Sequence, residues 1–193
     1  MLNTEDFDRI RTEIDKREKK REQVIIESRP IIKLSKRIIS ALHRQNQNEA
    51  VERVNEIKEK FTKLKSQINK NPELHFIGSF KVACQEYVEA LCLFEIITNN
   101  KLPNNKDLEV DEEHYLLGLT DLGGELVRLG VNSAIREEYD IFIKIKDFMQ
   151  DLYEEFLKMD LRNGELRKKF DGMKYDLKKL EELALELKLK DKI

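Results

Sequence analysis

Two pairs of acidic residues stand in surroundings where ionised side chains are costly. Glu86 and Glu89 lie in the most apolar stretch of the chain, residues 73–98, and Asp121 and Glu125 lie in a second apolar segment. Residues three or four positions apart share one side of a helix, about one turn apart. A carboxylate buried there without a partner costs far more free energy than one at the surface. Each pair therefore requires a compensating charge.

If the two segments lie side by side, the two pairs form one pocket. We call this set the acidic cluster: Glu86, Glu89, Asp121 and Glu125. Hard oxygen donors without a convergent His or Cys suit Mg²⁺ or Mn²⁺ better than zinc. Such ions activate water and stabilise the charge that develops on a phosphodiester during hydrolysis. A structural network of carboxylates and basic groups, with Arg128 as one partner, is the alternative that the spacing leaves open.

The composition predicts that helices position these acids. Charged residues make up 38% of the 193 residues and hydrophobic ones 40%, with few Gly and Pro and no Trp, which favours long amphipathic helices. Apolar residues recur at three- and four-residue steps. The helices that they predict cover about residues 4–44, 49–69, 73–98, 111–133, 136–159 and 163–189. We therefore predict an all-α, single-domain antiparallel helical bundle of six or seven helices over residues 1–193.

Details of three of these segments lead to further expectations. In the first, an apolar stripe starts at Phe7, Ile10 and Ile14, and Pro30 predicts a kink or two consecutive helices. The third is apolar around nearly its whole circumference and should be buried.

The fourth predicted helix carries clustered glycines, Gly118, Gly123 and Gly124, each costing about 1 kcal/mol relative to Ala inside a helix. Their clustering suggests that another helix or a ligand approaches closely.

Charge and cysteine usage limit the classes of protein. The net charge is −2, so affinity for nucleic acid must come from a local arrangement of Lys and Arg. Cys84 and Cys92 are expected to be buried thiols, since eight helical positions separate them by about 12 Å, too far for a disulfide. The first eight residues have no apolar signal region, and no apolar run is long enough for a membrane span. We expect a cytoplasmic protein without a membrane partner.

Several motifs carry a resemblance to the translin/TRAX family. Glu86-Tyr-Val-Glu-Ala90 resembles the catalytic-helix motif of TRAX, the nuclease subunit of the translin-TRAX complex, and residues 121–128 resemble its second acidic motif. Residues 27–29 and 35–44 are similar to the first long helix of TRAX, residues 166–179 resemble the C-terminal helix of translin, and residues 130–133 also recur in the family. The resemblance covers most of the chain.

The resemblance implies a translin-like fold and a ribonuclease activity. Translin-type subunits lack the full acidic set and bind RNA, whereas TRAX-type subunits carry it and cut RNA. A chain with TRAX-like acids and a translin-like C-terminus looks like an archaeal-type member that assembles alone. The implied protein is a Mg²⁺-dependent endoribonuclease, with Mn²⁺ as a possible substitute, acting on single-stranded RNA inside a hollow homo-octamer. The acidic cluster would be both its metal-binding and its catalytic site.

Basic residues on the family-like segments are the candidates for RNA contacts. Lys36, Arg37, Arg44 and Arg128 are expected to neutralise phosphates. The run of residues 16–21 is interspersed with glutamate and is better explained as a solvated helix face. His43, His75 and His114 are isolated in the sequence, and we expect no catalytic role for them. Two alternatives remain: a non-catalytic scaffold that binds single-stranded RNA or DNA, and a structural bundle that acts as an adaptor.

Overall fold

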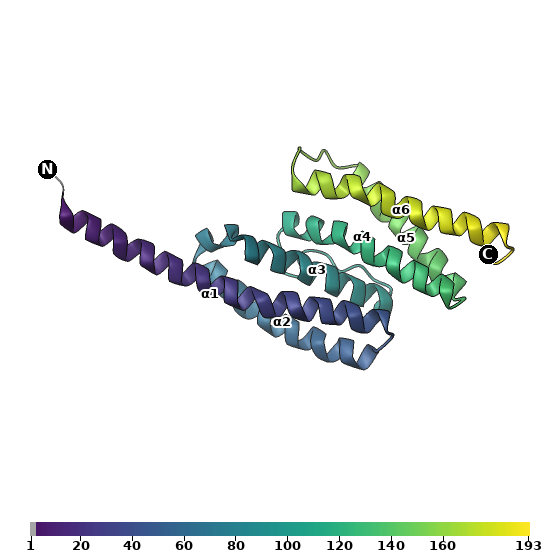
Figure 1. The fold of residues 1–193 in the computed structure, drawn as a ribbon, viewed down its shortest axis with the longest axis horizontal. Helices are drawn as coiled ribbons and strands as arrows, with labels where there is room; N and C mark the ends of the chain where they lie inside the picture. The colour runs from purple at the N-terminus through teal and green to yellow at the C-terminus, as the bar shows by residue number, and fades with distance from the viewer. Residues whose placement is uncertain (1–2) are drawn as a thin grey trace.

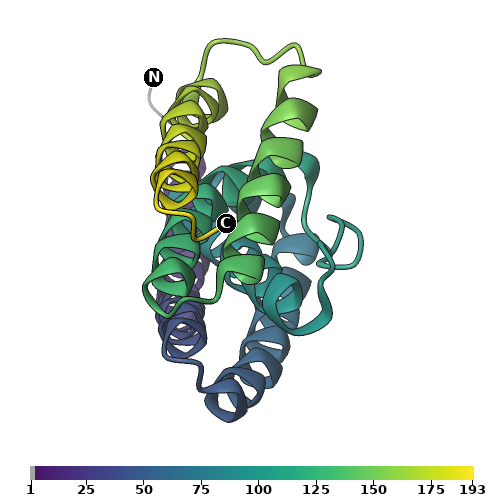
Figure 2. The ribbon, with the colours of Figure 1, turned by 90° about the vertical axis from the view of Figure 1, so that its right-hand side faces the viewer.

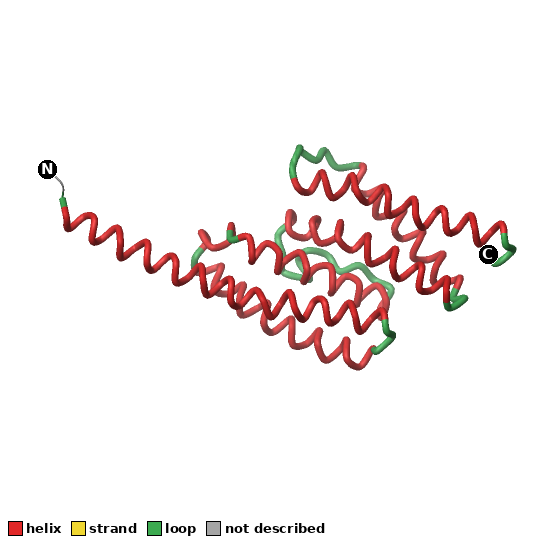
Figure 3. The backbone as a smooth tube through the Cα atoms, in the orientation of Figure 1, coloured by secondary structure: helices red, strands yellow, loops and turns green. Residues whose placement is uncertain are grey.

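The chain is helical almost throughout, as predicted. The computed structural model describes residues 3–193 and contains six α-helices, one short 3-10 helix and no strand within that range (Figures 1 and 3). The elements are α1 (Thr4–His43), α2 (Gln47–Lys70), η1 (Pro72–Phe76), α3 (Gly78–Asn99), α4 (Glu112–Ile135), α5 (Tyr139–Leu157) and α6 (Glu165–Leu189). Met1 and Leu2, the start of the segment searched for a signal region, lie outside the described residues.

Two central helices hold the bundle together. α3 packs against both α1 and α4, α2 pairs with α1, and α5 and α6 pack on α4 (Figures 1 and 2). Half of the 22 residues of α3 are buried, which confirms the prediction made from its apolar circumference. The elements that carry the acidic cluster are thus the two that lie between the outer pairs of helices.

The first helix is continuous, and its N-terminal apolar stripe is not buried. α1 runs as one helix through Pro30, so the alternative of two consecutive helices is wrong; Pro30 is exposed, and water can reach the carbonyl that loses its hydrogen bond. Its N-terminal part extends beyond the other helices (Figure 1). Phe7, Ile10 and Ile14 are therefore exposed, and the burial of α1 begins only at Val24. The apolar stripe does not belong to the core of this chain.

The segment predicted as one helix over residues 73–98 is divided. η1 ends at Phe76, Ile77 is extended, and α3 begins at Gly78. The short 3-10 turn buries Leu74 but leaves Phe76 exposed, and such turns seldom continue beyond a few residues. This division places His75 on an element of its own, apart from α3.

Other expectations agree with the described residues. Cys84 and Cys92 are both buried and free, and burial raises the pKa of both thiols. No helix within residues 3–193 has the length and apolar character needed to cross a bilayer.

Candidate active site

The structure brings the two pairs of acids together between α3 and α4. The pKa of Glu89 is raised to about 8, first by burial and then by the charges of Asp121, Glu86 and Glu125, against a smaller lowering by Lys169. Since three acids from two helices all act on Glu89, the acidic cluster is one electrostatic unit. This is the convergence that the spacing predicted, and the catalytic and metal-binding roles of the four residues stay predictions.

A glycine on α4 allows α3 to come close. A Cβ added at Gly118 would lie 2.6 Å from Val88 Cβ and 2.9 Å from the backbone oxygen of Gln85. At Gly123 an added Cβ would lie 3.2 Å from Met149 Cε on α5 and 3.6 Å from Asp176 Oδ2 on α6, and at Gly124 it would meet nothing within 4 Å. The predicted close approach of another helix is therefore confirmed for Gly118, extends to side chains at Gly123, and is not seen at Gly124.

A lysine from α6 neutralises Asp121. Lys169 Nζ donates to Asp121 Oδ1 and Oδ2 at 2.7 and 2.6 Å and lies 3.4 Å from Gln85 Oε1. Both charged side chains are part-buried, at 28% and 34% exposed. Sequence reasoning gave Lys169 no place in this site. Its position in the segment 166–179 that resembles translin was the available signal.

A histidine from the end of α1 contacts Glu125. His43 Nε2 forms a hydrogen bond with Glu125 Oε2, and Arg128 Nη1 lies 3.6 Å from the same oxygen. These contacts, that of His43 first, lower the pKa of Glu125 against the opposing effect of burial. His43 is buried, and its Nδ1 has no hydrogen-bond partner among residues 3–193. The expectation that His43 is isolated is therefore wrong.

Glu86 has a weaker partner and Glu89 has none. Lys36 Nζ lies 3.5 Å from Glu86 Oε1, but burial outweighs it and raises the pKa of Glu86. No side chain in the described part of the chain forms a hydrogen bond or ion pair with Glu89. The alternative of an ion-pair network thus describes three of the four acids, with Lys36, Lys169 and His43 as the main partners.

The donor set fits a hard divalent cation, although the oxygens are not gathered into one shell. Within residues 3–193, no three of the four acids bring ligand atoms within 4.8 Å of one another. Within residues 3–193, Glu89 nevertheless has no ion pair of its own, and three neighbouring acids raise its pKa while the charge of Lys169 opposes them only in part. A divalent cation is the species that relieves such an excess among carboxylate oxygens.

The basic residues predicted to contact RNA have different surroundings. Lys36 and Arg128 contact the acidic cluster itself, and Arg44 pairs with Glu49 at 2.9 Å. Arg37 is exposed, and the described residues offer it no ion pair. Two of the four basic residues therefore lie beside the acids, and Arg37 is the one whose charge is free.

The fold and the site together define a class: helical bundles in which two central helices share four acids and the outer helices supply the neighbouring cations. The chain belongs to the Translin family, whose model matches residues 19–191. This match confirms the resemblance seen in the motifs.

Individual relatives include both types of subunit. The chain is 36% identical over 155 residues to "Uncharacterized protein MJ0175" of Methanocaldococcus jannaschii, covering 78% of this chain and 68% of that protein. It is 39% identical to "Translin" of Gallus gallus over 61% of this chain, and the match spans about half (52%) of that translin. It is 24% identical to "Translin-associated protein X" of Rattus norvegicus, over 95% of this chain and 78% of that protein.

Solved structures have the same fold. The crystal structure of apo-NeC3PO has a TM-score of 0.86 and 29% identity, covering 96% of this chain and 97% of that one. The structure of AfC3PO in complex with duplex RNA has a TM-score of 0.83 and 25% identity, covering 95% and 96%.

Proposed function

We propose that this protein is a Mg²⁺-dependent endoribonuclease that cleaves single-stranded RNA inside a hollow homo-oligomer. The observation that carries the proposal is Glu89. It is a part-buried carboxyl group that burial and three neighbouring acids disfavour as an anion, and no basic side chain among residues 3–193 forms an ion pair with it. A residue kept in this condition costs stability, and such residues are concentrated at functional sites.

The acidic cluster would hold the ion, with Mn²⁺ as a possible substitute. When bound, the ion supplies an activated water and stabilises charge on the phosphodiester. Lys169 fixes the direction of the Asp121 carboxylate through two hydrogen bonds. His43, on α1, forms a hydrogen bond with Glu125 and lowers the pKa of that carboxyl group. Lys36 and Arg128 place positive charge beside the acids, where a phosphate would lie.

The proposed substrate and assembly rest on the relatives and on the surface. A structure with the same fold holds duplex RNA, and the matches include translin and translin-associated protein X. On α1, Phe7, Ile10 and Ile14 form an exposed apolar stripe of the kind that packs against another protein surface. We propose that a second copy of the chain covers it and that the assembly has eight subunits, the number that the resemblance to the family implies. Arg37 would contact RNA directly.

A second candidate function follows from the ion pairs. Because three of the four acids already have basic partners, the protein could bind single-stranded RNA or DNA without cutting it. In that case the acids stabilise the bundle and the exposed basic residues bind nucleic acid.

One experiment separates the candidates. The purified full chain is incubated with single-stranded RNA in Mg²⁺ or in chelator, alongside Glu89→Gln and Asp121→Asn. The nuclease predicts cleavage only with Mg²⁺ and only by the wild type, with RNA binding retained in both variants. Unchanged turnover in either variant contradicts the site. Binding without cleavage identifies the scaffold, and no salt-dependent affinity for RNA identifies a structural adaptor.

A further inference from the structure

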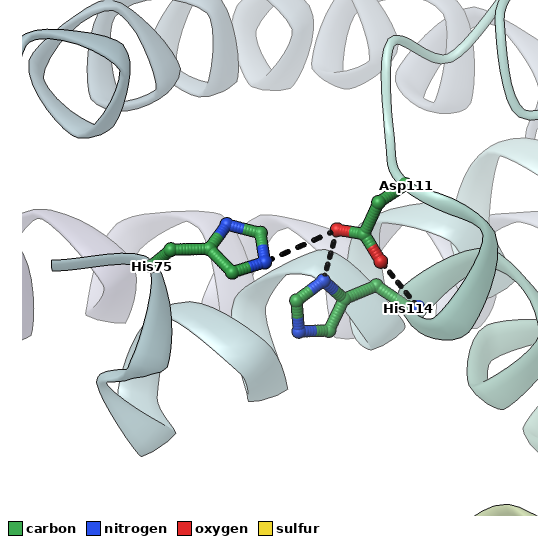
Figure 4. A group of neighbouring side chains, drawn as sticks. All are labelled: His75, Asp111 and His114. Carbon is green, nitrogen blue, oxygen red and sulfur yellow. Dashed lines mark hydrogen bonds and ion pairs between the residues drawn. The ribbon is translucent and has the colours of Figure 1, made fainter. Parts of the chain in front are cut away.

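A second group of metal-ligating side chains lies at the N-terminal end of α4, whereas the acidic cluster lies at the middle of that helix. His75 belongs to η1, Asp111 is the N-cap of α4, and His114 lies in the first turn of α4 (Figure 4). One ligand atom from each residue lies within 4.8 Å of the other two. Asp121 is about 15 Å further along α4 at a rise of ~1.5 Å per residue. We propose that His75, Asp111 and His114 bind a divalent transition-metal ion of the zinc type.

The two oxygens of Asp111 have separate tasks. Oδ1 accepts a hydrogen bond from the backbone N–H of His114 at 3.0 Å, which caps α4. Oδ2 points between the two imidazole rings (Figure 4). The cap bond fixes the direction of the carboxylate, as hydrogen bonds to metal ligands commonly do. Helix capping therefore explains the position of Oδ1, whereas Oδ2 faces the two imidazole rings and is the oxygen that would bind the ion.

The distances around Oδ2 are close to those of a ligand shell. His75 Nε2 lies 3.6 Å from Oδ2, too far for a hydrogen bond. His114 Nδ1 lies 2.5 Å from the same oxygen. A tetrahedral ion with bonds of about 2.0–2.1 Å separates its ligand atoms by about 3.3 Å. The His75 distance of 3.6 Å is close to that separation, and a small rotation of the His114 ring would lengthen its 2.5 Å contact to the same separation when an ion replaces the proton between the two atoms.

The donor types select the class of metal. Two imidazole nitrogens and one carboxylate oxygen suit zinc and its first-row neighbours, whereas Mg²⁺ prefers oxygen alone. The acidic cluster offers only oxygen, so the two sites should bind different ions. Three protein ligands also leave a fourth position open to water or to another group.

The surroundings hold the rings in place and leave access on one side. The ring of Phe80 packs edge-on against both His75 and His114, at centroid distances of 5.6 and 6.0 Å. The His114 side chain is 7% exposed, while those of His75 and Asp111 are 38% and 34% exposed. A cavity of about 350 Å³ lined by His75 and Asp111 adjoins the group. An ion could enter from this side, and once bound it would tie η1 to the start of α4.

The test is a Co²⁺ titration of the tag-free, metal-stripped full chain in excess Mg²⁺, which occupies sites made of oxygen alone. We expect one equivalent of Co²⁺ per chain, with visible d–d absorption bands that Zn²⁺ abolishes by displacement. His75→Phe keeps the shape of the ring and removes the ligand, and it should weaken Co²⁺ binding at least ~10-fold. His75→Gln serves the same purpose, so the result does not depend on the folding of one variant.

Two control variants separate this site from the acidic cluster. Glu89→Gln removes a ligand of the proposed nuclease site, and His43→Gln removes the remaining histidine of the chain. Both should bind Co²⁺ as the wild type does. Wild-type protein without the bands, equal affinity in both His75 variants, or loss of the bands in Glu89→Gln would each overturn the proposal. None of these results depends on whether the protein cleaves RNA.

Discussion

Lys169 on α6 donates hydrogen bonds to both carboxylate oxygens of Asp121 on α4, at 2.7 and 2.6 Å. The ammonium group therefore occupies the side of Asp121 from which a metal ion would also be bound. If the acidic cluster binds Mg²⁺ as proposed, a cation built into the chain and a cation from solution compete for the same carboxylate. The balance between them would then decide how the acidic cluster behaves with and without Mg²⁺.

Replacing Lys169 should make the stability of the protein depend on Mg²⁺. Lys169→Met leaves the part-buried Asp121 without its partner, and we expect the free energy of unfolding to fall by about 1–2 kcal/mol in chelator. In saturating Mg²⁺ the loss should shrink, since the ion compensates Asp121. Lys168→Met is the control, because Lys168 is its exposed neighbour. Thermal unfolding of both variants checks this, and a loss that Mg²⁺ leaves unchanged would contradict competition at Asp121.

Glu89 should make the metal-free protein less stable at alkaline pH. Its pKa is raised from 4.5 to about 8 in the folded chain, so the folded state holds a proton that the unfolded state releases. The stability that the protonated Glu89 contributes is fully present below pH 4.5 and is lost as the pH rises to about 8. Glu89→Gln cannot ionise and should have the higher Tm above that range. We expect the Tm of Glu89→Gln to exceed that of the wild type by at least about 2–4 °C, which corresponds to about 1 kcal/mol in a domain of this size.

The comparison at acidic pH is the control for Glu89→Gln. Below pH 4.5 both chains carry a neutral side chain at position 89, and their Tm values should agree. A constant difference at every pH would mean that the substitution acts through packing instead of charge.

His43 should stabilise the protein at neutral pH and lose this effect in acid. Its hydrogen bond lowers the pKa of Glu125 below 4.5, and a lowered carboxyl pKa contributes stability that disappears as pH falls through it. His43→Gln should therefore reduce Tm more at neutral pH than at a pH where Glu125 is protonated. Arg128→Gln, which removes the longer contact of 3.6 Å from an exposed side chain, should have the smaller effect.

Two glycines on α4 should respond in opposite directions to the same substitution. Gly118→Ala places a Cβ 2.6 Å from Val88 Cβ, and the forced separation of α3 and α4 should cost about 1–3 kcal/mol. Gly124→Ala meets nothing within 4 Å and should stabilise the helix by up to about 1 kcal/mol. Chemical denaturation of both variants measures this. A stabilising Gly118→Ala would show that α3 and α4 are not in close contact there.

The sequence predicted those features of the fold that are set by the spacing of residues along a single helix. The helical class, the buried character of α3 and the shared position of Glu86 and Glu89 all follow from periodicity, and they agree with the structure. The clustering of glycines predicted the backbone contact at Gly118 and the side-chain contacts at Gly123 but not the open space at Gly124, because the sequence does not tell which sides of α4 face other helices.

Side-chain contacts between segments that are distant in the chain could not be predicted from the sequence. His43 and Glu125 are 82 residues apart, and Lys169 and Asp121 are 48 apart, so no local spacing connects them. His75 and His114 looked isolated for the same reason, although their rings lie 5.1 Å apart. The break at Ile77 depends on which residues the bundle buries, which a helical pattern over residues 73–98 does not reveal.

The most direct test of the central claim is the anomalous density of crystals soaked in Mn²⁺. The account predicts a peak between α3 and α4 within bonding distance of oxygens from Glu89 and Asp121, with Lys169 drawn away from Asp121. Glu89→Gln crystals, soaked in the same way, should lose it. A wild-type map without a peak there, in which Lys169, His43 and Lys36 keep their present partners, would contradict the claim that these acids bind a metal ion.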